Sequence, residues 1–492
     1  MAILTRQPRI RLSKERLRVF RRQRAQKARQ ARRVLDRNHQ QLPKQVRALL
    51  DPLAPAFSRP TYRRFALLAV AAILTLGGHT ICNLLRCLGA LAPGHPSSYH
   101  RVFSRSPWSC WHLARRFTQV ILARFAPKDV IELAGDDTVA EHPGPKVYGK
   151  GCHRDPVRST HSFTAFRWGH KWVVLALLVR FPFATRRWAL PLLMALYQPE
   201  EENRRQRRRH KTPPELLRQM LLVLIRWFPD RRFVCTADGN YATHDLAELA
   251  AHHSRRLTFI SKFYPDANLV APPPDYSDNK GRPRVKGRPR VKGKKLPTPE
   301  QMVASTVKGQ RLEVAWYGGG RRRVEVITGT GHWYKSGRPL VAVRWVFVRD
   351  LTGTHRDEYF FTTDSTMSPE LVIETYTGRW NIETTFQEVR SYLRLETTRG
   401  WSRNTVLRVG PCLFGLYTVV AYLYAELPSR YARVRVVDWP GKRDVTFSDA
   451  ITAVRRWLWL EWIFAIPGHR VAFSKLSGPF RQILLNGLAP AA

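Results

Sequence analysis

Short apolar runs alternate with amphipathic segments between residues 130 and 263, and this alternation restricts the fold more than any other feature of the sequence. Thr212 is a good helix N-cap, and Pro213 is tolerated in the first turn, so a helix is expected from there to Trp227. Apolar runs on both sides of this helix predict strands. The expected strands are 130–134, 171–181, 184–196, 232–236 and 257–261, with another helix at 244–252. This order predicts an α/β mixed sheet flanked by helices.

The charge of the chain points to its partner. Basic residues outnumber acidic ones by 83 to 37, which gives a formal net charge of +46. Such a field attracts polyanions, so nucleic acid is the expected partner and an anionic membrane surface is the alternative. The longest apolar stretch, 65–76, is shorter than the roughly 20 residues of a membrane-spanning helix, and no secretory signal is evident. Six cysteines without paired spacing are expected to be reduced and mostly buried. We therefore expect a cytoplasmic, DNA-binding protein that does not use a membrane.

Two segments concentrate the positive charge. Residues 1–50 contain sixteen Lys or Arg against two acids, and they fit either a basic helix on DNA or a disordered basic arm. The hexad Gly-Arg-Pro-Arg-Val-Lys occurs twice, at 281–286 and 287–292. Its Gly-Arg-Pro core resembles the AT-hook, whose arginines enter a narrow minor groove, and a solvated linker is the alternative interpretation. The candidate DNA-binding residues of this loop are Arg282, Arg284, Arg288 and Arg290.

A possible DNA-reading element precedes the sheet. An apolar helix at 63–76, a Gly77-Gly78 turn and a helix at 80–88 fit a helix-turn-helix motif. In that motif Asn83 and Arg86 would be available to DNA. An ordinary αα-hairpin has the same pattern, so the spacing alone leaves both interpretations open.

Acidic residues are scarce in this chain, and two of them follow apolar strands. Asp136 or its neighbour Asp137 follows the strand at 130–134, and Asp238 follows the strand at 232–236. In an α/β sheet the ends of strands are where side chains emerge into a site. A buried carboxylate without a cation or water is costly, so these positions indicate a cation-binding site.

A third acid lies on a long helix that begins after Ser368. On one continuous helix, with about 100° per residue, Tyr376, Arg379, Glu383 and Arg390 fall within a narrow arc beside the apolar face. A structural Glu–Arg pair explains part of this pattern. Together with the two aspartates and the positive charge, however, Glu383 suggests carboxylates that hold two divalent ions for phosphoryl transfer on DNA. An all-oxygen site suits Mg²⁺.

The spacing Tyr376-x2-Arg379-x3-Glu383-x6-Arg390 resembles the Y-(2)-R-(3)-E-(6)-K signature of bacterial insertion-sequence transposases of the DDE class. The runs Gly135–Thr138 and Thr236–Ala242 resemble the motifs that contain the first and second aspartates of that class. The resemblance implies an RNase H-like catalytic core with a β insertion between Asp238 and Glu383.

The same resemblance implies roles for individual residues. Asp136, rather than Asp137, matches the first metal-binding acid, and Asp238 and Glu383 match the other two. Tyr376 and Arg379 match positions that contact phosphates near the cut DNA end. Arg390 stands in place of the family's lysine, and a guanidinium forks where an ammonium is a point charge. Mg²⁺ is the implied cofactor in a two-metal site, with Mn²⁺ as a substitute.

The expected protein is therefore a metal-dependent DNA transposase that works as a homodimer on element ends and target DNA in the bacterial nucleoid. A degenerate transposase that binds DNA without catalysis, as a repressor or architectural factor, is the alternative. The predicted segments are a basic arm (1–50), a helical DNA-binding domain (51–129), the first part of the catalytic core (130–263), a basic loop with a β-rich insertion (264–365), a signature helix that completes the core (366–400) and a helical C-terminal region (401–492).

Overall fold

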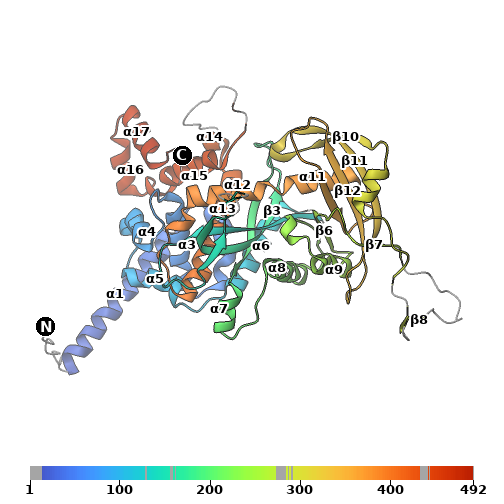
Figure 1. Ribbon diagram of the computed structural model, residues 1–492. Helices are drawn as coiled ribbons and strands as arrows, with labels where there is room; N and C mark the ends of the chain where they lie inside the picture. Colours follow the sequence, from blue (N-terminus) through green and yellow to red (C-terminus); the bar gives the residue numbers. More distant parts are fainter. Residues whose placement is uncertain are drawn as a thin grey trace.

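The computed structural model describes residues 14–127, 130–155, 159–160, 162–272, 284–285, 288–289, 292–432, 442 and 444–490. One large sheet runs through the molecule, with helices from both ends of the chain at one side and a β-rich region at the other (Figure 1). The mixed α/β class predicted from the sequence is confirmed.

The centre of the sheet contains five strands in the order β4-β3-β1-β5-β6. Strands β1, β3 and β4 are antiparallel neighbours, whereas β5 and β6 run parallel to β1 on its other side. Three antiparallel strands followed by two parallel ones form the RNase H-like arrangement that the resemblance implies. The short strand β2 shares the edge of β3 with β4. The bounds are β1 (Val130–Glu141), β2 (Gly151–Arg154), β3 (Phe166–Val179), β4 (Trp188–Tyr197), β5 (Arg232–Ala237) and β6 (Leu257–Lys262).

Helices cover both faces of this sheet. Helix α8 (Pro213–Trp227) leads from β4 to β5, after the short α7 (Glu200–Arg205), and α9 (His244–His252) joins β5 to β6. A Cβ on Gly135 of β1 would lie 2.8 Å from Leu217, so α8 covers that face closely. The predicted start of α8 is confirmed, because Thr212 and Glu215 form a reciprocal capping box there. Helix α12 (Asn381–Leu393) packs on β1 and β4 from the opposite face.

The β-rich insertion extends the central sheet. Strand β13 pairs antiparallel with β6, and β12, β11 and β10 follow in that order, so one sheet connects the core to the insertion. Strand β7 pairs with the end of β11, and β8 pairs with β9 in a separate two-stranded hairpin. The bounds are β7 (Leu269–Val270), β8 (Arg284–Val285), β9 (Arg288–Pro289), α10 (Pro299–Ser305), β10 (Gln310–Ala315), β11 (Arg321–Trp333), β12 (Val341–Asp350) and β13 (Glu358–Thr362).

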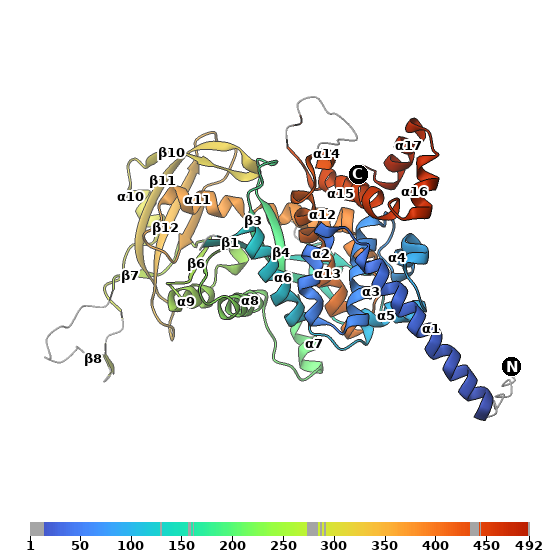
Figure 2. The same cartoon turned by 180° about the vertical axis from the view of Figure 1, so that it is seen from behind.

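The N-terminal part is helical, and its first helix leaves the body of the molecule. Helix α1 (Lys14–Gln40) packs only through its last turns, where Leu35, Asn38 and His39 are buried, and it extends away from the other helices in both views (Figures 1 and 2). The basic helix, one of the two alternatives for residues 1–50, is therefore the observed form of residues 14–40. The other helices are α2 (Lys44–Leu50), α3 (Arg59–Leu74), α4 (Ile81–Leu88), α5 (Pro96–Ser104) and α6 (Cys110–Phe125).

The predicted helix pair before the sheet is present as α3 and α4. Thr80 caps α4 by accepting a hydrogen bond from the Asn83 backbone. The Asn83 amide donates to the Gly78 carbonyl and accepts from Arg86, so both candidate DNA contacts are bonded within the motif. The choice between a DNA-reading motif and a structural hairpin stays open.

The C-terminal region contributes a long core helix. Helix α13 (Arg403–Ala425) is long and apolar enough to cross a membrane by length and composition, yet most of its apolar window is buried, and it packs against β4 and α15. The bounds of the remaining helices are α14 (Ser429–Ala432), α15 (Phe447–Leu458), α16 (Pro467–Ser474) and α17 (Gly478–Leu488). All six cysteines lie in described residues and none forms a disulfide, but only Cys235 is buried, so the expectation that most are buried was wrong.

Two sequence-based expectations about the acidic residues need correction. Strand β1 does not end at Asp136: its pairing with β3 continues from Asp136 opposite Val174 to Glu141 opposite Gly169. The predicted long helix is two helices, α11 (Pro369–Gly378) and α12, separated at Arg379 and Trp380. Hydrogen bonds of the tighter i to i+3 type occupy this turn, so an angle of 100° per residue does not carry through it.

Candidate active site

Asp136 and Asp137 lie in the middle of β1 and point to opposite faces of the sheet, because successive side chains of a strand alternate. The Asp137 carboxylate accepts a hydrogen bond from Tyr241 at 2.8 Å and forms an ion pair with Lys171 at 3.0 Å. The Asp136 carboxylate lies toward the turn between α11 and α12, where it contacts Arg379. The two neighbouring aspartates therefore have separate surroundings, and only Asp136 faces the signature helix.

Asp238 reaches the same region from the neighbouring strand. The parallel pairing of β1 with β5 ends where Gly135 lies opposite Ala237, so the next residue of each strand is an aspartate. Asp238 has an extended backbone and begins the turn that follows β5. Its side chain is one-third exposed. Because β5 ends at Ala237 while β1 continues, the Asp136 and Asp238 carboxylates lie near each other where the pairing of the two strands stops.

Glu383 comes from the first turn of α12, on a separate part of the chain. A tight turn at Arg379 and Trp380 joins α11 to α12, and the Glu383 backbone donates to the Trp380 carbonyl at 3.0 Å. The side chain of Glu383 is 48% exposed, more than that of Asp238 or of Asp136, which is 15% exposed. The three predicted acids therefore form a cluster that is deepest at Asp136 and open at Glu383.

One guanidinium contacts all three carboxylates. Arg379 lies 2.5 Å from Asp136, and one of its terminal nitrogens lies 3.5 Å from both Asp238 and Glu383. The Arg379 side chain is only 5% exposed. Spacing along a helix explains only the contact with Glu383, since the two aspartates come from the sheet. The structure therefore brings together the three predicted acids and one of the predicted DNA-binding residues.

The electrostatics of the cluster follow from burial and close like charges. Burial raises the pKa of Asp136 to about 7; Arg379 opposes this rise, while the carboxylates of Asp238 and Asp137 add to it. Burial also raises the pKa of Glu383, against the effect of Arg379. Burial alone would lower the pKa of Arg379, but the neighbouring carboxylates raise it above its ordinary value. Arg379 is thus a firmly charged cation beside Asp136 and Glu383, whose ionised forms burial disfavours.

The structure places Tyr376 inside the protein. Its side chain is fully buried, packs against Phe360 of β13 with ring centroids 4.3 Å apart, and lies beneath the Arg379 guanidinium. It does not share an accessible rim with Glu383, because Phe360 and the Arg379 guanidinium cover its ring. A DNA contact by Tyr376 would need another arrangement of this region and stays a prediction.

The other predicted DNA-binding residues do not join the acid cluster. Arg390 donates to the Thr138 hydroxyl at 2.6 Å, and Thr138 lies two residues beyond Asp136 on the same face of β1. In the doubled hexad, Arg284 and Arg288 lie in the paired strands β8 and β9, at the opposite end of the molecule from α1 (Figures 1 and 2). Arg282 and Arg290 lie outside the described residues.

Sequence reasoning missed two residues that bind Asp137 on the other face of the sheet. Tyr241 and Lys171 both bind Asp137, and they hold its carboxylate on the α8 side of the sheet. Tyr241 lies three residues after Asp238, so its place in the same motif was a usable signal. Lys171 gave no such signal, because its approach to Asp137 depends on the register between β1 and β3.

A divalent-ion site can be assessed only through the residues that would form it. Within the described part of the chain, no group of three or more Asp, Glu, His or Cys residues is arranged to hold a metal ion. The chemistry of Asp136, Asp238 and Glu383 does fit a hard cation, since all their donors are carboxylate oxygens. In this structure the Arg379 guanidinium lies between these donors.

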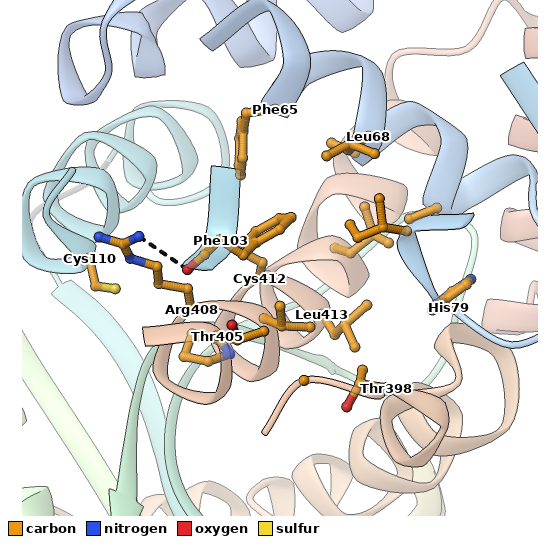
Figure 3. A pocket seen from close by; sticks show the side chains of 18 of the residues that line it. Phe65, Leu68, His79, Phe103, Cys110, Thr398, Thr405, Arg408, Cys412 and Leu413 are labelled. Atoms are coloured by element: carbon orange, nitrogen blue, oxygen red, sulfur yellow. Dashed lines mark hydrogen bonds between the residues drawn. The ribbon is translucent and has the colours of Figure 1, made fainter. Parts of the chain in front are cut away.

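A large apolar cavity lies away from the acid cluster. It measures about 840 Å³ between the N-terminal helices and α13, and its lining includes Phe65, Phe103 and Leu413 but none of the three acids. Figure 3 shows these apolar side chains around the cavity, with Arg408 donating to the Phe103 carbonyl at 3.1 Å. The acid cluster therefore lies outside this cavity.

The sequence matches the model of a known protein family. Residues 52–323, more than half of the sequence, match the model of the DDE superfamily endonucleases, so the chain is a member of that family. The matched range contains Asp136 and Asp238 and ends before Glu383. A cryo-EM structure of a piggyBac transposase synaptic complex with hairpin DNA is similar at 9% identity, with a TM-score of 0.37, over 92% of this chain and 83% of that one. No curated protein matches the sequence.

Proposed function

We propose that this DDE-family protein is the transposase of a bacterial insertion sequence and catalyses DNA strand cleavage and strand transfer. The observation that carries the proposal is the convergence of Asp136, Asp238 and Glu383, from β1, β5 and α12, on one point at the edge of the sheet. The family model covers the first two acids, and the signature spacing supplies the third.

The proposed chemistry is phosphoryl transfer in two steps. Water attacks a phosphodiester at the element end, the P–O3′ bond breaks and a 3′-hydroxyl is released. That hydroxyl then attacks a phosphodiester of the target DNA and displaces another 3′-oxygen, which takes up a proton. The three carboxylates would hold two Mg²⁺ ions, or Mn²⁺ as a substitute, and ions in such a site activate the attacking oxygen and stabilise the leaving oxygen.

Double-stranded DNA is the proposed partner, both as element ends and as target. The net charge of +46 and the exposed arginines of α1 support this proposal, since phosphate neutralisation dominates binding to DNA. Joining two ends requires two catalytic sites, so we propose a homodimer in the synaptic complex. A cytoplasmic, nucleoid-associated location follows from this partner.

The test uses DNA that carries the terminal repeats flanking the gene. We expect the purified wild-type protein to nick this DNA with Mg²⁺, and Glu383→Gln to bind the DNA normally but cleave it about 10⁴-fold more slowly, since a metal-binding carboxylate is lost. Glu370→Gln is the matched control, because Glu370 is an exposed acid on the neighbouring helix α11. This variant should cleave DNA at the wild-type rate.

Two results would contradict the assignment in different ways. Full cleavage by Glu383→Gln would remove Glu383 from the catalytic set. No nicking by the wild-type protein with either Mg²⁺ or Mn²⁺, together with tight binding to the same DNA, would favour the alternative of a DNA-binding repressor or architectural protein.

A further inference from the structure

We propose that Arg379 is an internal counter-cation that occupies the acid cluster of the metal-free protein and must leave it before divalent ions bind. The inference rests on the proposed metal-dependent function, but it gives Arg379 a role other than the phosphate contact expected for it. The signature resemblance implies a phosphate contact for Arg379, whereas in this structure its guanidinium is directed at carboxylates.

The contacts of Arg379 come from three separate elements and are unlike those of a surface ion pair. Its partners lie on β1, after β5 and on α12, and the contact with Asp136 measures 2.5 Å. The guanidinium is almost completely buried and lies over the Tyr376 ring, 5.5 Å from its centroid. Such a fork can hold several carboxylates at once, because guanidinium presents its donors in a fixed plane.

The charges explain why the cluster needs a cation. Three carboxylates around one point repel one another, and burial penalises the ionised form of the deepest, Asp136. Arg379 offsets part of this repulsion and so keeps the acids gathered before any metal arrives. Divalent ions would offset it more completely, but a guanidinium at the same point would repel them and occupy the same oxygen atoms.

The local backbone gives Arg379 a route out of the cluster. The residue lies in the turn after Gly378, between α11 and α12, and is not in the middle of either helix. The cluster opens toward solvent on the side of Glu383, whose side chain is about half exposed. Rotation of the Arg379 side chain toward that side would free all three carboxylates without unfolding a helix. Metal binding and the departure of Arg379 are therefore coupled.

The test measures Mn²⁺ binding to the full chain without DNA, by electron paramagnetic resonance of the free ion. We expect Arg379→Gln, which removes the charge, to bind Mn²⁺ at least tenfold more tightly than the wild-type protein. Arg379→Lys, which keeps a charge but cannot fork to three acids, should lie between the two. Arg186→Gln is the matched control: Arg186 pairs with Glu388 of α12 at 2.8 Å, outside the cluster, and its loss should leave Mn²⁺ affinity unchanged.

Circular dichroism establishes that each variant is folded, and if Arg379→Gln does not fold, Arg379→Lys alone decides the test. Equal or weaker Mn²⁺ binding by the folded Arg379 variants would overturn the counter-cation role and leave the transposase proposal standing. If neither the wild-type protein nor any variant binds Mn²⁺, and the wild-type protein does not cleave DNA, the proposed function itself is overturned. Tighter binding by the variants, in the order lysine then glutamine, supports the coupling.

Discussion

Helix α1 and the acid cluster use arginine in opposite ways. Between residues 18 and 33, α1 carries eight exposed Lys or Arg side chains, and none of them has an ion pair within the described part of the chain. Arg379 is buried and contacts three carboxylates. The difference lies in the acids nearby. The eight side chains of α1 form no ion pair among the described residues and are free to pair with an external polyanion, whereas Arg379 is already paired with internal carboxylates.

The comparison shows what the excess of positive charge does in this chain. The few acids near the base of α1 are already used, since Asp36 binds both Arg59 and Arg63. The eight side chains beyond it repel one another, and a helix that is polar on every side gains little from packing. DNA phosphates would supply the missing countercharge, and an α-helix with its side chains fits the major groove.

The largest expected effect concerns the deepest partner of Arg379. Asp136→Asn should reduce DNA cleavage about 10⁴-fold, because it removes a metal-binding carboxylate, whereas Asp137→Asn should retain far more activity. Single-turnover cleavage of end-labelled DNA measures both rates. Comparable loss in the two variants, with both proteins folded, would mean that the opposite orientation of these neighbours does not separate their roles.

The next effect tests the free arginines of α1. Replacing the eight basic residues between 18 and 33 by glutamine should weaken binding to duplex DNA about 10³-fold near 0.15 M salt. The slope of log affinity against log salt should become shallower by roughly 0.9 for each DNA phosphate that the protein no longer neutralises. Fluorescence anisotropy across a series of salt concentrations gives both values.

Helix α7 supplies the matched control for that experiment. Arg204 and Arg205 are exposed like the residues of α1, but each forms an ion pair with a glutamate four residues earlier, at 3.3 and 2.8 Å. Replacing both by glutamine should change DNA affinity only a few-fold. A reduction as large as that of the α1 variant would show that exposure alone, without the absence of local acids, decides which arginines bind DNA.

Much of the fold could be predicted from the sequence because its signals are local. The capping residues around Thr212, the apolar runs of the core strands and the β character of the insertion all act within a few neighbouring residues. The continuation of β1 past Asp136 was missed because it depends on β3, which supplies hydrogen-bond partners along that length. The joining of the insertion to β6 was missed for the same reason, since strand pairing is a long-range property.

The candidate site shows the same division. The identity of the three acids could be proposed from the apolar runs that precede Asp136 and Asp238 and from the signature spacing of Glu383. The role of Arg379 could not, because the sequence places it four residues from Glu383 and 243 residues from Asp136, and only the folded sheet brings the second contact about. The expectation that Tyr376 shares an accessible rim with Glu383 was wrong, because its side chain packs into the core against Phe360 and beneath Arg379.

His79 provides a third environment that sharpens the comparison, since it is a buried base with no carboxylate partner among its described contacts. Its ring donates to the Leu393 carbonyl at the end of α12, and its backbone donates to Thr397. Burial lowers the pKa of His79 to about 4, the hydrogen bonds to backbone carbonyls oppose this shift, and nearby arginines add to it. Burial beside carboxylates leaves the pKa of Arg379 raised, whereas burial without them lowers the pKa of His79 and keeps its ring neutral.

This difference predicts a specific sensitivity to acid. Because the pKa of His79 is lower in the folded protein than in the unfolded chain, its contribution to stability is present above about pH 6.5 and is lost as pH falls toward 4. The loss is about 3 kcal/mol at most, since each pH unit between the two pKa values is worth roughly 1.4 kcal/mol. Urea unfolding at pH 7, 5.5 and 4 should show a smaller loss of free energy for His79→Gln than for the wild-type protein. Identical pH dependence in the two proteins would mean that protonation of His79 does not lower the free energy of unfolding. Burial without a carboxylate partner would then not explain the behaviour of this histidine.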